Sequence, residues 1–318
     1  MPSSQSVTKT AEHTDLTKSI LKAMLYFDIF KYPLTATEIF QHLTTNHVTQ
    51  ENVETELNNL CNQSIIYPVL NFYSIHNDNA LASRRVMGNQ MAAHSLSLAQ
   101  KKALHISKFP FVRAVMASGS LSKGYMDESS DLDFFVITQP GRLWIARFLL
   151  VLYKKIFLFN SHKYFCINYF VDESHLDIEE KNLFTATELA TLIPLYGKEY
   201  YSLLISANRW MNMYLPNHTP RSTENVSAYH PGWLKRTTEK LINLAWANKI
   251  ESACMQLLSS RWKQRYQPIY SKADFEIAFK TKKYVSKGHP NNHQRKVLDM
   301  YHQKLEEFGN KLSIDWND

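Results

Sequence analysis

The stretch that decides the fold is residues 118–134, SGSLSKGYMDESSDLDF. An apolar run at residues 112–117 precedes it, and a second apolar run at residues 132–138 overlaps its end. This pattern predicts a strand, a turn and a second strand. Glycine supplies only 8 of the 318 residues. Gly119 and Gly124 nevertheless both fall in this window, so we expect the backbone to need glycine there.

Two carboxylates open the second predicted strand. Because successive side chains of a strand point to opposite faces, Asp131 and Asp133 should project from the same side, with Leu132 and Phe134 on the other. Side by side, the two acids repel, and each raises the pKa of the other unless a cation neutralises them. Mg²⁺ is the simplest such cation, since it takes carboxylate oxygens and completes its shell with water and phosphate oxygens. We therefore expect Asp131 and Asp133 to be metal ligands.

The turn before these acids suits a phosphate group. Gly119 and Ser120 offer backbone N–H groups and a hydroxyl with no bulky side chain in the way. A small-residue turn alone is common, and so is an Asp-x-Asp pair at a strand edge. Here the two features occur together, which strengthens both interpretations.

The combination resembles the nucleotidyltransferase signature of the DNA polymerase beta superfamily, in which an apolar strand leads to Gly-Ser and then to Asp-x-Asp in a second strand. The resemblance rests on Gly119-Ser120, Lys123-Gly124 and Ser130-Asp131-Leu132-Asp133. It implies that Asp131 and Asp133 bind Mg²⁺ or Mn²⁺ and are catalytic together with Asn168. The implied substrate is a nucleoside triphosphate (NTP), bound by Gly119, Ser120, Ser122, Lys123 and Ser130.

The implied reaction moves a nucleoside monophosphate to a hydroxyl on a small molecule, a protein or RNA. Active members of the superfamily usually supply a third carboxylate from a neighbouring strand. Residues 164–171 form that predicted strand here, and Asn168 is its best-placed polar residue. Its amide can coordinate an ion but cannot act as a base. Substitute acids follow the strand or lie in the loop before Asp131: Asp172, Glu173, Asp177 and Glu128.

The amide at Asn168 leaves a second function open, a catalytically weak nucleotide-binding regulator or interaction protein that uses its N-terminal region. The whole chain is also similar to a prokaryotic group of uncharacterised nucleotidyltransferase-like proteins with an N-terminal winged-helix-like region. This wider resemblance rests on Cys166-Ile-Asn168-Tyr169 and Asn208-Arg-Trp210. It identifies relatives but implies no established reaction.

The sequence as a whole predicts an α+β, α-rich, multidomain protein with a small mixed-sheet nucleotidyltransferase core. We expect a disordered tail at residues 1–15, a winged-helix-like domain at 16–78, a connecting helix at 79–110, the core at 111–215 and a mainly helical region at 216–318.

The winged-helix-like interpretation comes from three helical patterns followed by a short β-hairpin. Thr35 and Glu38 form a capping box at the second helix, and Thr185 and Glu188 predict another within the core. The third helix, at residues 50–63, contains three Glu residues and no Lys or Arg. Such a helix suits a phosphate groove poorly, so DNA is a possible partner but not a favoured one.

The C-terminal region carries two further expectations. Residues 234–266 read as helical, with a core stripe formed by Leu241, Leu244, Ile250, Leu257 and Leu258. Residues 282–295 are basic and interrupted by glycine and proline, which favours a solvated loop over a nucleic-acid contact. Arg142 and Arg147, just after the second strand, either approach phosphate or form ordinary ion pairs.

Composition limits the remaining classes. The chain is 44% hydrophobic and 20% charged, as in globular proteins. Its three cysteines are too few and too far apart for a disulfide framework or a Cys-based metal site, which indicates a reducing compartment. The net charge of +7 permits attraction to phosphate-rich partners. Because no membrane span or export signal is visible, we expect a cytoplasmic protein without a membrane partner.

Overall fold

The computed structural model describes residues 14–159, 163, 165–243, 246–288, 290 and 292–316. Within these residues the chain is mixed α/β, with twelve α-helices, a two-stranded sheet and a six-stranded mixed sheet. It divides into two units. The first takes in Met1–Ser83, Met213–His218 and Val297–Asp318, and the second Arg84–Asn212 and Thr219–Lys296. The expected domain boundaries stay predictions.

Three helices and a hairpin open the first unit, in the predicted order. The elements are α1 (Asp15–Asp28), α2 (Ala36–Gln41), α3 (Gln50–Asn62), β1 (Tyr67–Val69) and β2 (Phe72–Ser74). The capping box of α2 is confirmed, because the Thr35 side chain accepts from the Glu38 backbone and the Glu38 side chain accepts from the Thr35 backbone. Thr49 caps α3 in the same way with Asn52.

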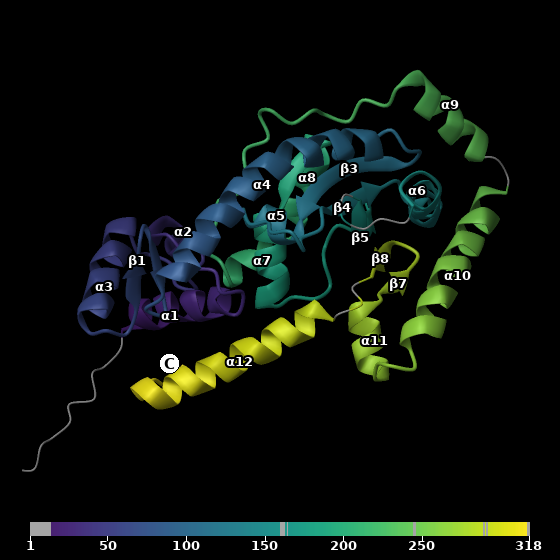
Figure 1. Ribbon diagram of the computed structural model, residues 1–318. Coiled ribbons are helices and arrows are strands. Elements are labelled where there is room, and N and C mark those ends of the chain that lie inside the picture. The colour runs from purple at the N-terminus through teal and green to yellow at the C-terminus, as the bar shows by residue number, and fades with distance from the viewer. Residues whose placement is uncertain are drawn as a thin grey trace, which may run out of the picture. The chain divides into compact units, whose positions relative to one another are not determined.

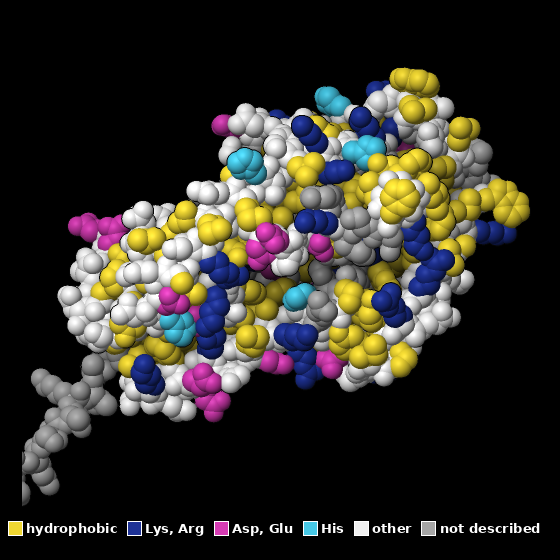
Figure 2. Space-filling model, in the orientation of Figure 1, with side chains coloured by type: hydrophobic (Ala, Val, Ile, Leu, Met, Phe, Trp, Pro, Cys, Tyr) yellow, Lys and Arg dark blue, Asp and Glu magenta, His cyan; other side chains and the backbone are white. Residues whose placement is uncertain are grey.

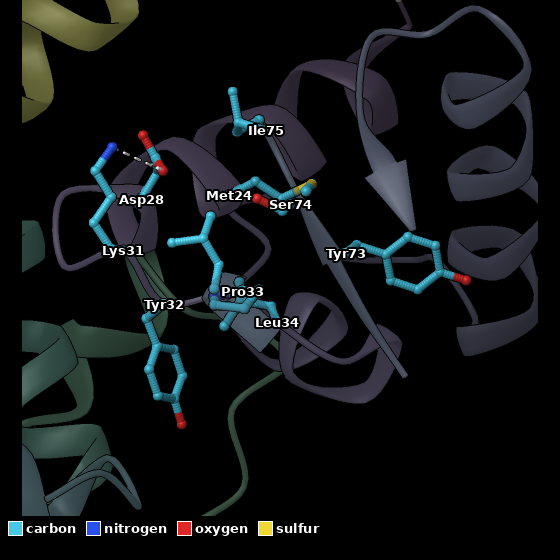
Figure 3. Close-up of a pocket in the computed structure, with 10 residues that line it drawn as sticks. Met24, Asp28, Lys31, Tyr32, Pro33, Leu34, Tyr73, Ser74 and Ile75 are labelled. Carbon is cyan, nitrogen blue, oxygen red and sulfur yellow. Dashed lines mark ion pairs between the residues drawn. The ribbon is translucent and has the colours of Figure 1, made fainter. Parts of the chain in front are cut away.

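Asp28 ties the end of α1 to two other segments of this unit. Its buried carboxylate lies 3.1 Å from His76 Nε2 and 2.5 Å from Lys304 Nζ, and Lys304 belongs to α12 (His293–Leu312). Figure 3 shows Asp28 and Lys31, which form a longer 3.8 Å ion pair, at a small pocket that Tyr73 of β2 also lines. Burial alone would raise the pKa of Asp28, but the Lys304 hydrogen bond and the charges of His76 and Lys31 bring it below its ordinary value.

The second unit is built on the six-stranded sheet, whose order is β6-β3-β4-β5-β8-β7 (Figure 1). Its strands are β3 (Val112–Ser118), β4 (Asp133–Thr138), β5 (Cys166–Asp172), β6 (Ile193–Tyr196), β7 (Thr281–Lys282) and β8 (Val285–Lys287). The pair β4 and β5 is parallel, and the other pairs are antiparallel. The strand–turn–strand prediction is therefore confirmed, and β5 occupies the third predicted strand.

Helices surround the sheet. They are α4 (Asn79–Ile106), α5 (Gly119–Ser122), α6 (Leu143–Phe157), α7 (Leu183–Thr191), α8 (Lys198–Ala207), the 3₁₀-helix η1 (Arg209–Met213), α9 (Trp233–Ile242), α10 (Ala247–Tyr266) and α11 (Lys272–Ala278). The core includes Phe134, Val136 and Phe170 from the strands, Trp144 from α6 and Leu258 from α10. Side chains of α6 and α10 therefore cover one face of the sheet. The long helix expected within residues 79–110 is present as α4.

Three local predictions are wrong. The helix that contains Thr185 and Glu188 begins earlier, at Leu183, and its cap is Asn182, whose side chain accepts from the Thr185 backbone. Residues 282–295 do not form one solvated loop, because β8 pairs with β5 in the sheet and α12 begins at His293.

The predicted core stripe of the C-terminal region is the third error. Leu241, Ile250 and Leu257 are exposed, and of the five leucine and isoleucine positions only Leu258 is seen to be buried. Leu244 lies outside the described residues, as does most of the expected tail at residues 1–15.

The cysteines and the hydropathy of the helices are also visible in the described residues. All three cysteines are free, in agreement with the absence of a disulfide framework. None of the described helices combines the length and apolar character that a bilayer-spanning segment needs.

We predict that Asp28→Asn destabilises the first unit by about 1–2 kcal/mol at neutral pH, because Lys304 and His76 lose a buried charged acceptor. The folded-state pKa of Asp28 lies below its unfolded value of about 4. Its stabilisation is therefore complete above that pH and is lost as the pH falls through the folded-state value. Urea unfolding measures the free energy of unfolding of the unsubstituted chain and of Asp28→Asn, and the difference between the two should become smaller towards pH 3. An equal difference in the free energy of unfolding at pH 7 and pH 3 would contradict the lowered pKa of Asp28.

Candidate functional site

Gly119 brings the backbone against the Asp133 carboxylate. Ser118, the last residue of β3, pairs with Asp133, the first residue of β4, so the turn begins beside that acid. Gly119 has φ +65, and a Cβ at this position would overlap Asp133 Oδ2. Only glycine combines this backbone conformation with this approach. The turn after the first strand is thus placed as the sequence predicted.

Asp131 and Asp133 alternate with apolar neighbours as expected. Both acids are half-buried, whereas Leu132 and Phe134 are fully buried. Burial raises the pKa of Asp133 to about 7, and the nearby Asp131 and Glu188 carboxylates raise it too, while Cys166 and Lys123 act in the opposite direction. The two predicted metal ligands therefore form an electrostatically unfavourable pair in the absence of a cation.

Asn168 contacts Asp133 directly. A bulge in the pairing of β4 with β5 separates Ile167, opposite Phe134, from Tyr169, opposite Phe135. Asn168 occupies the bulge, and its Nδ2 donates to Asp133 Oδ1 at 2.6 Å. The Cys166 thiol donates to the Asn168 carbonyl oxygen at 3.1 Å. The amide thus presents its donor to the acid.

Glu188 is the acid that sequence reasoning missed. It projects from α7, and its Oε1 lies 2.7 Å from Lys123 Nζ. Lys123 Nζ also donates to the Gly119 carbonyl oxygen at 3.2 Å. Since Glu188 also raises the pKa of Asp133, it belongs to the same cluster. The sequence pattern assigned Glu188 to a capping box and therefore gave it no role in the site. In the structure it lies in the middle of α7, four residues after Phe184 and three before Thr191.

The other predicted phosphate-binding residues have partners inside the protein. Ser122 is fully buried and donates to the Gly119 carbonyl oxygen at 2.8 Å. Ser130 donates to Asp127 at 2.8 Å within the connecting turn, and Ser120 contacts the sulfur of Met126 at 3.6 Å. These residues shape the segment between the strands. Of the predicted phosphate-binding residues, Gly119 contacts Asp133, and Lys123 is close enough to lower the pKa of Asp133.

The substitute acids after β5 lie at the wrong end of the sheet. Asp172 pairs with Thr138, five residues along β4 from Asp133, which places it about 17 Å away at the usual rise of a strand. It accepts hydrogen bonds from His175 and from the Ser174 backbone. Glu173 faces Arg113 at 4.0 Å, and Asp177 pairs with Lys181 at 3.1 Å. None of these three can replace the third carboxylate.

Two candidate arginines and one loop acid are also placed by the structure. Arg142 donates to Asn243 and Asn248. Arg147 is buried between the rings of Phe170 and Trp262, at 4.8 and 4.7 Å. Phe170 belongs to the core face of the sheet, so Arg147 does not share the face of Asp133. Glu128 is exposed in the turn before Asp131.

The donor set fits a hard divalent ion bound together with a phosphate group. Within the described ranges no cluster of three or more His, Cys, Asp or Glu side chains has the arrangement of a complete metal site. Mg²⁺ does not need one, because it is commonly held by one or two carboxylates plus substrate phosphates. Asp131 and Asp133 supply such a pair, and a bound cation would remove the electrostatic repulsion between their carboxylates.

Comparison with known proteins adds no assignment. No family model matches the chain, and searches of curated proteins and of solved structures also find no match. The interpretation of the site therefore depends on its own residues.

We predict that Gly119→Ala destabilises the second unit by about 2–4 kcal/mol, because the new methyl group combines a left-handed backbone with overlap of Asp133. Gly141→Ala is the matched control. Gly141 has φ +67 and open space around its Cα, so only the backbone cost of about 1 kcal/mol applies. Thermal unfolding of both variants measures the difference, and equal losses would contradict the close approach of Asp133.

Proposed function

We propose that the second unit is a metal-dependent nucleotidyltransferase. It moves a nucleoside monophosphate from an NTP to a hydroxyl acceptor: the acceptor oxygen bonds to the α-phosphorus, and pyrophosphate leaves. The observation that carries this proposal is the Asp133 carboxylate, fixed against Gly119 and beside Asp131 with its pKa raised to about 7. A protein rarely keeps two half-buried acids together at a strand end unless a cation joins them. The glycine turn places backbone next to the same point, where a phosphate group can approach.

Each residue of the cluster has a role in this proposal. Asp131 and Asp133 hold Mg²⁺ or Mn²⁺, which when bound neutralises charge on the triphosphate and polarises the phosphorus under attack. Gly119 and Ser120 face the phosphates. Lys123 exchanges Glu188 for a phosphate oxygen when the triphosphate binds, since both are anionic acceptors for one ammonium group.

Glu188 is the proposed acceptor of the proton from the attacking hydroxyl. Asn168 cannot take this role because a neutral amide is not a base. Its donor group instead holds Asp133 in place. When Lys123 binds the phosphates, it no longer pairs with Glu188, and the Glu188 carboxylate becomes free to accept a proton. Substrate binding is thereby coupled to activation of the acceptor hydroxyl.

Asn168 also supports a second candidate, a regulator that binds nucleotide without transferring it. The hydrogen bond from its amide satisfies Asp133 without a third charge. A site of this kind retains ligand binding after catalysis is lost. The two candidates share the metal and NTP and differ only in turnover.

We predict that Asp131→Ala combined with Asp133→Ala abolishes Mg²⁺-dependent NTP binding, because both carboxylate ligands are removed. Isothermal titration calorimetry with each NTP, with and without Mg²⁺, measures the effect. Asp177→Ala is the matched control, since it removes an exposed acid that pairs only with Lys181 among the described contacts. Binding that survives the double substitution would exclude the metal site.

We predict that Glu188→Gln lowers the rate of nucleotidyl transfer about 10²-fold or more and changes NTP affinity only a few-fold, as expected for loss of a general base. Transfer of radiolabel from each NTP to components of a cell extract provides the assay. Asn168→Asp tests the other candidate. If transfer is absent in the unsubstituted protein and appears with Asn168→Asp, the chain is a nucleotide-binding regulator and the transferase proposal is wrong.

A further inference from the structure

Helix α9 is packed with its polar side inwards. Lys235 is buried and donates to the Ser107 carbonyl oxygen at 2.8 Å and to that of Val112. Glu239, one turn later, accepts from the Phe111 backbone at 2.6 Å and from Arg113 at 3.2 Å. These ion and hydrogen-bond contacts, together with Ile242, which packs against the core, fix the helix to the unit.

The apolar side of α9 consequently faces solvent. Trp233 is 77% exposed, Leu234 64% and Leu241 63%. At about 100° per residue, Trp233 and Leu241 lie opposite Lys235 and Glu239. Soluble helices normally bury this stripe.

Helix α10 carries a second exposed stripe. Its exposed apolar residues are Ile250, Leu257 and Trp246, which lies just before the first residue of the helix. The spacing is four residues from Trp246 to Ile250 and seven from Ile250 to Leu257, so the three share one side of the helix. We call these three residues, with Trp233, Leu234 and Leu241, the α9–α10 apolar face. Figure 2 shows hydrophobic side chains gathered over the part of the second unit that carries α6, α9 and α10, with Lys and Arg side chains among them.

The charge around the α9–α10 apolar face is of one sign. Residues 232–267 contain two acids, Glu239 and Glu251, and both are turned inwards, Glu251 accepting from the Trp144 and Ile145 backbone at the start of α6. The exposed ionisable side chains of the two helices are all cationic: Arg236, Lys240, Lys249, Arg261, Lys263 and Arg265. In the described part of the chain, none of these six forms an ion pair with an acid.

We propose that the α9–α10 apolar face binds the surface of an anionic lipid bilayer. Exposed Trp and Leu beside Lys and Arg are the side chains that interfacial helices use, the apolar groups entering the headgroup boundary and the cations contacting lipid phosphates. A second copy of this chain is a poorer occupant, because it would set six cations against six. This binding requires no spanning segment.

Flotation of the full chain with lipid vesicles tests the proposal. We expect binding to phosphatidylcholine vesicles that contain about one third phosphatidylserine, and binding about tenfold weaker or absent with phosphatidylcholine alone or at high salt. Trp233→Ala with Leu241→Ala should weaken binding about tenfold or more. Arg236→Gln with Lys240→Gln should do the same at low salt, through lost attraction to the headgroups.

The matched control replaces two exposed apolar residues outside this face, Met87 of α4 and Leu203 of α8, with alanine. It should bind like the unsubstituted chain, and circular dichroism should show that every variant is folded. Three results would overturn the proposal: no binding to anionic vesicles, binding unaffected by Trp233→Ala with Leu241→Ala, or a stable dimer in light scattering that this pair of substitutions dissociates. The last result would assign the face to a second copy of the chain.

Discussion

The contact between Gly119 and the Asp133 carboxylate is the constraint on which the second unit depends. It sets where β3 ends and where β4 begins, because Ser118 and Asp133 are paired at that point. A shift of one residue in this register would turn Asp133 into the core and Phe134 out of it. The same contact leaves no room for a side chain at Gly119, so the backbone lies directly beside the half-buried Asp133 carboxyl group. The fold and the candidate site therefore both require glycine at position 119.

Around that contact the protein balances like charges in a small volume. Asp131, Asp133 and Glu188 are countered by Lys123, by Lys154 near Asp131, by Lys287 near Glu188, and by the neutral donor of Asn168. An aspartate in place of Asn168 would add a further negative charge next to Asp133, at a cost that only a bound cation could offset. The amide is thus consistent with a site that is stable without its ligand. In the proposed function the proton-accepting role therefore falls to Glu188 on α7.

Local patterns predicted most of the elements and misplaced those whose environment is set by distant residues. The strands β3 and β4 and the capping box at Thr35 follow from neighbouring residues alone. The apparent box at Thr185 fails because Asn182 is an equally good cap one turn earlier. Helical spacing predicted helix over residues 234–266, where α9 and α10 lie, but spacing does not say which side of a helix is buried. Lys235 and Glu239 decide that through partners more than a hundred positions away. The role of Glu188 depends on tertiary structure in the same way.

The pairing of β5 with β8 has a consequence for how the chain reaches its native state. Val171 pairs with Val285, so the edge of β5 has no partner from this hairpin until the chain has been made well past residue 285. A nascent chain that already holds β3, β4 and β5 presents an open strand edge during all of that synthesis. The paired residues are far apart in the sequence, which slows folding. The entropy cost of closing the long loop between them comes before the free energy gained from strand pairing. The first strands of this sheet are thus the part most exposed to intermolecular pairing on the ribosome, and completion of the C-terminal hairpin ends that exposure.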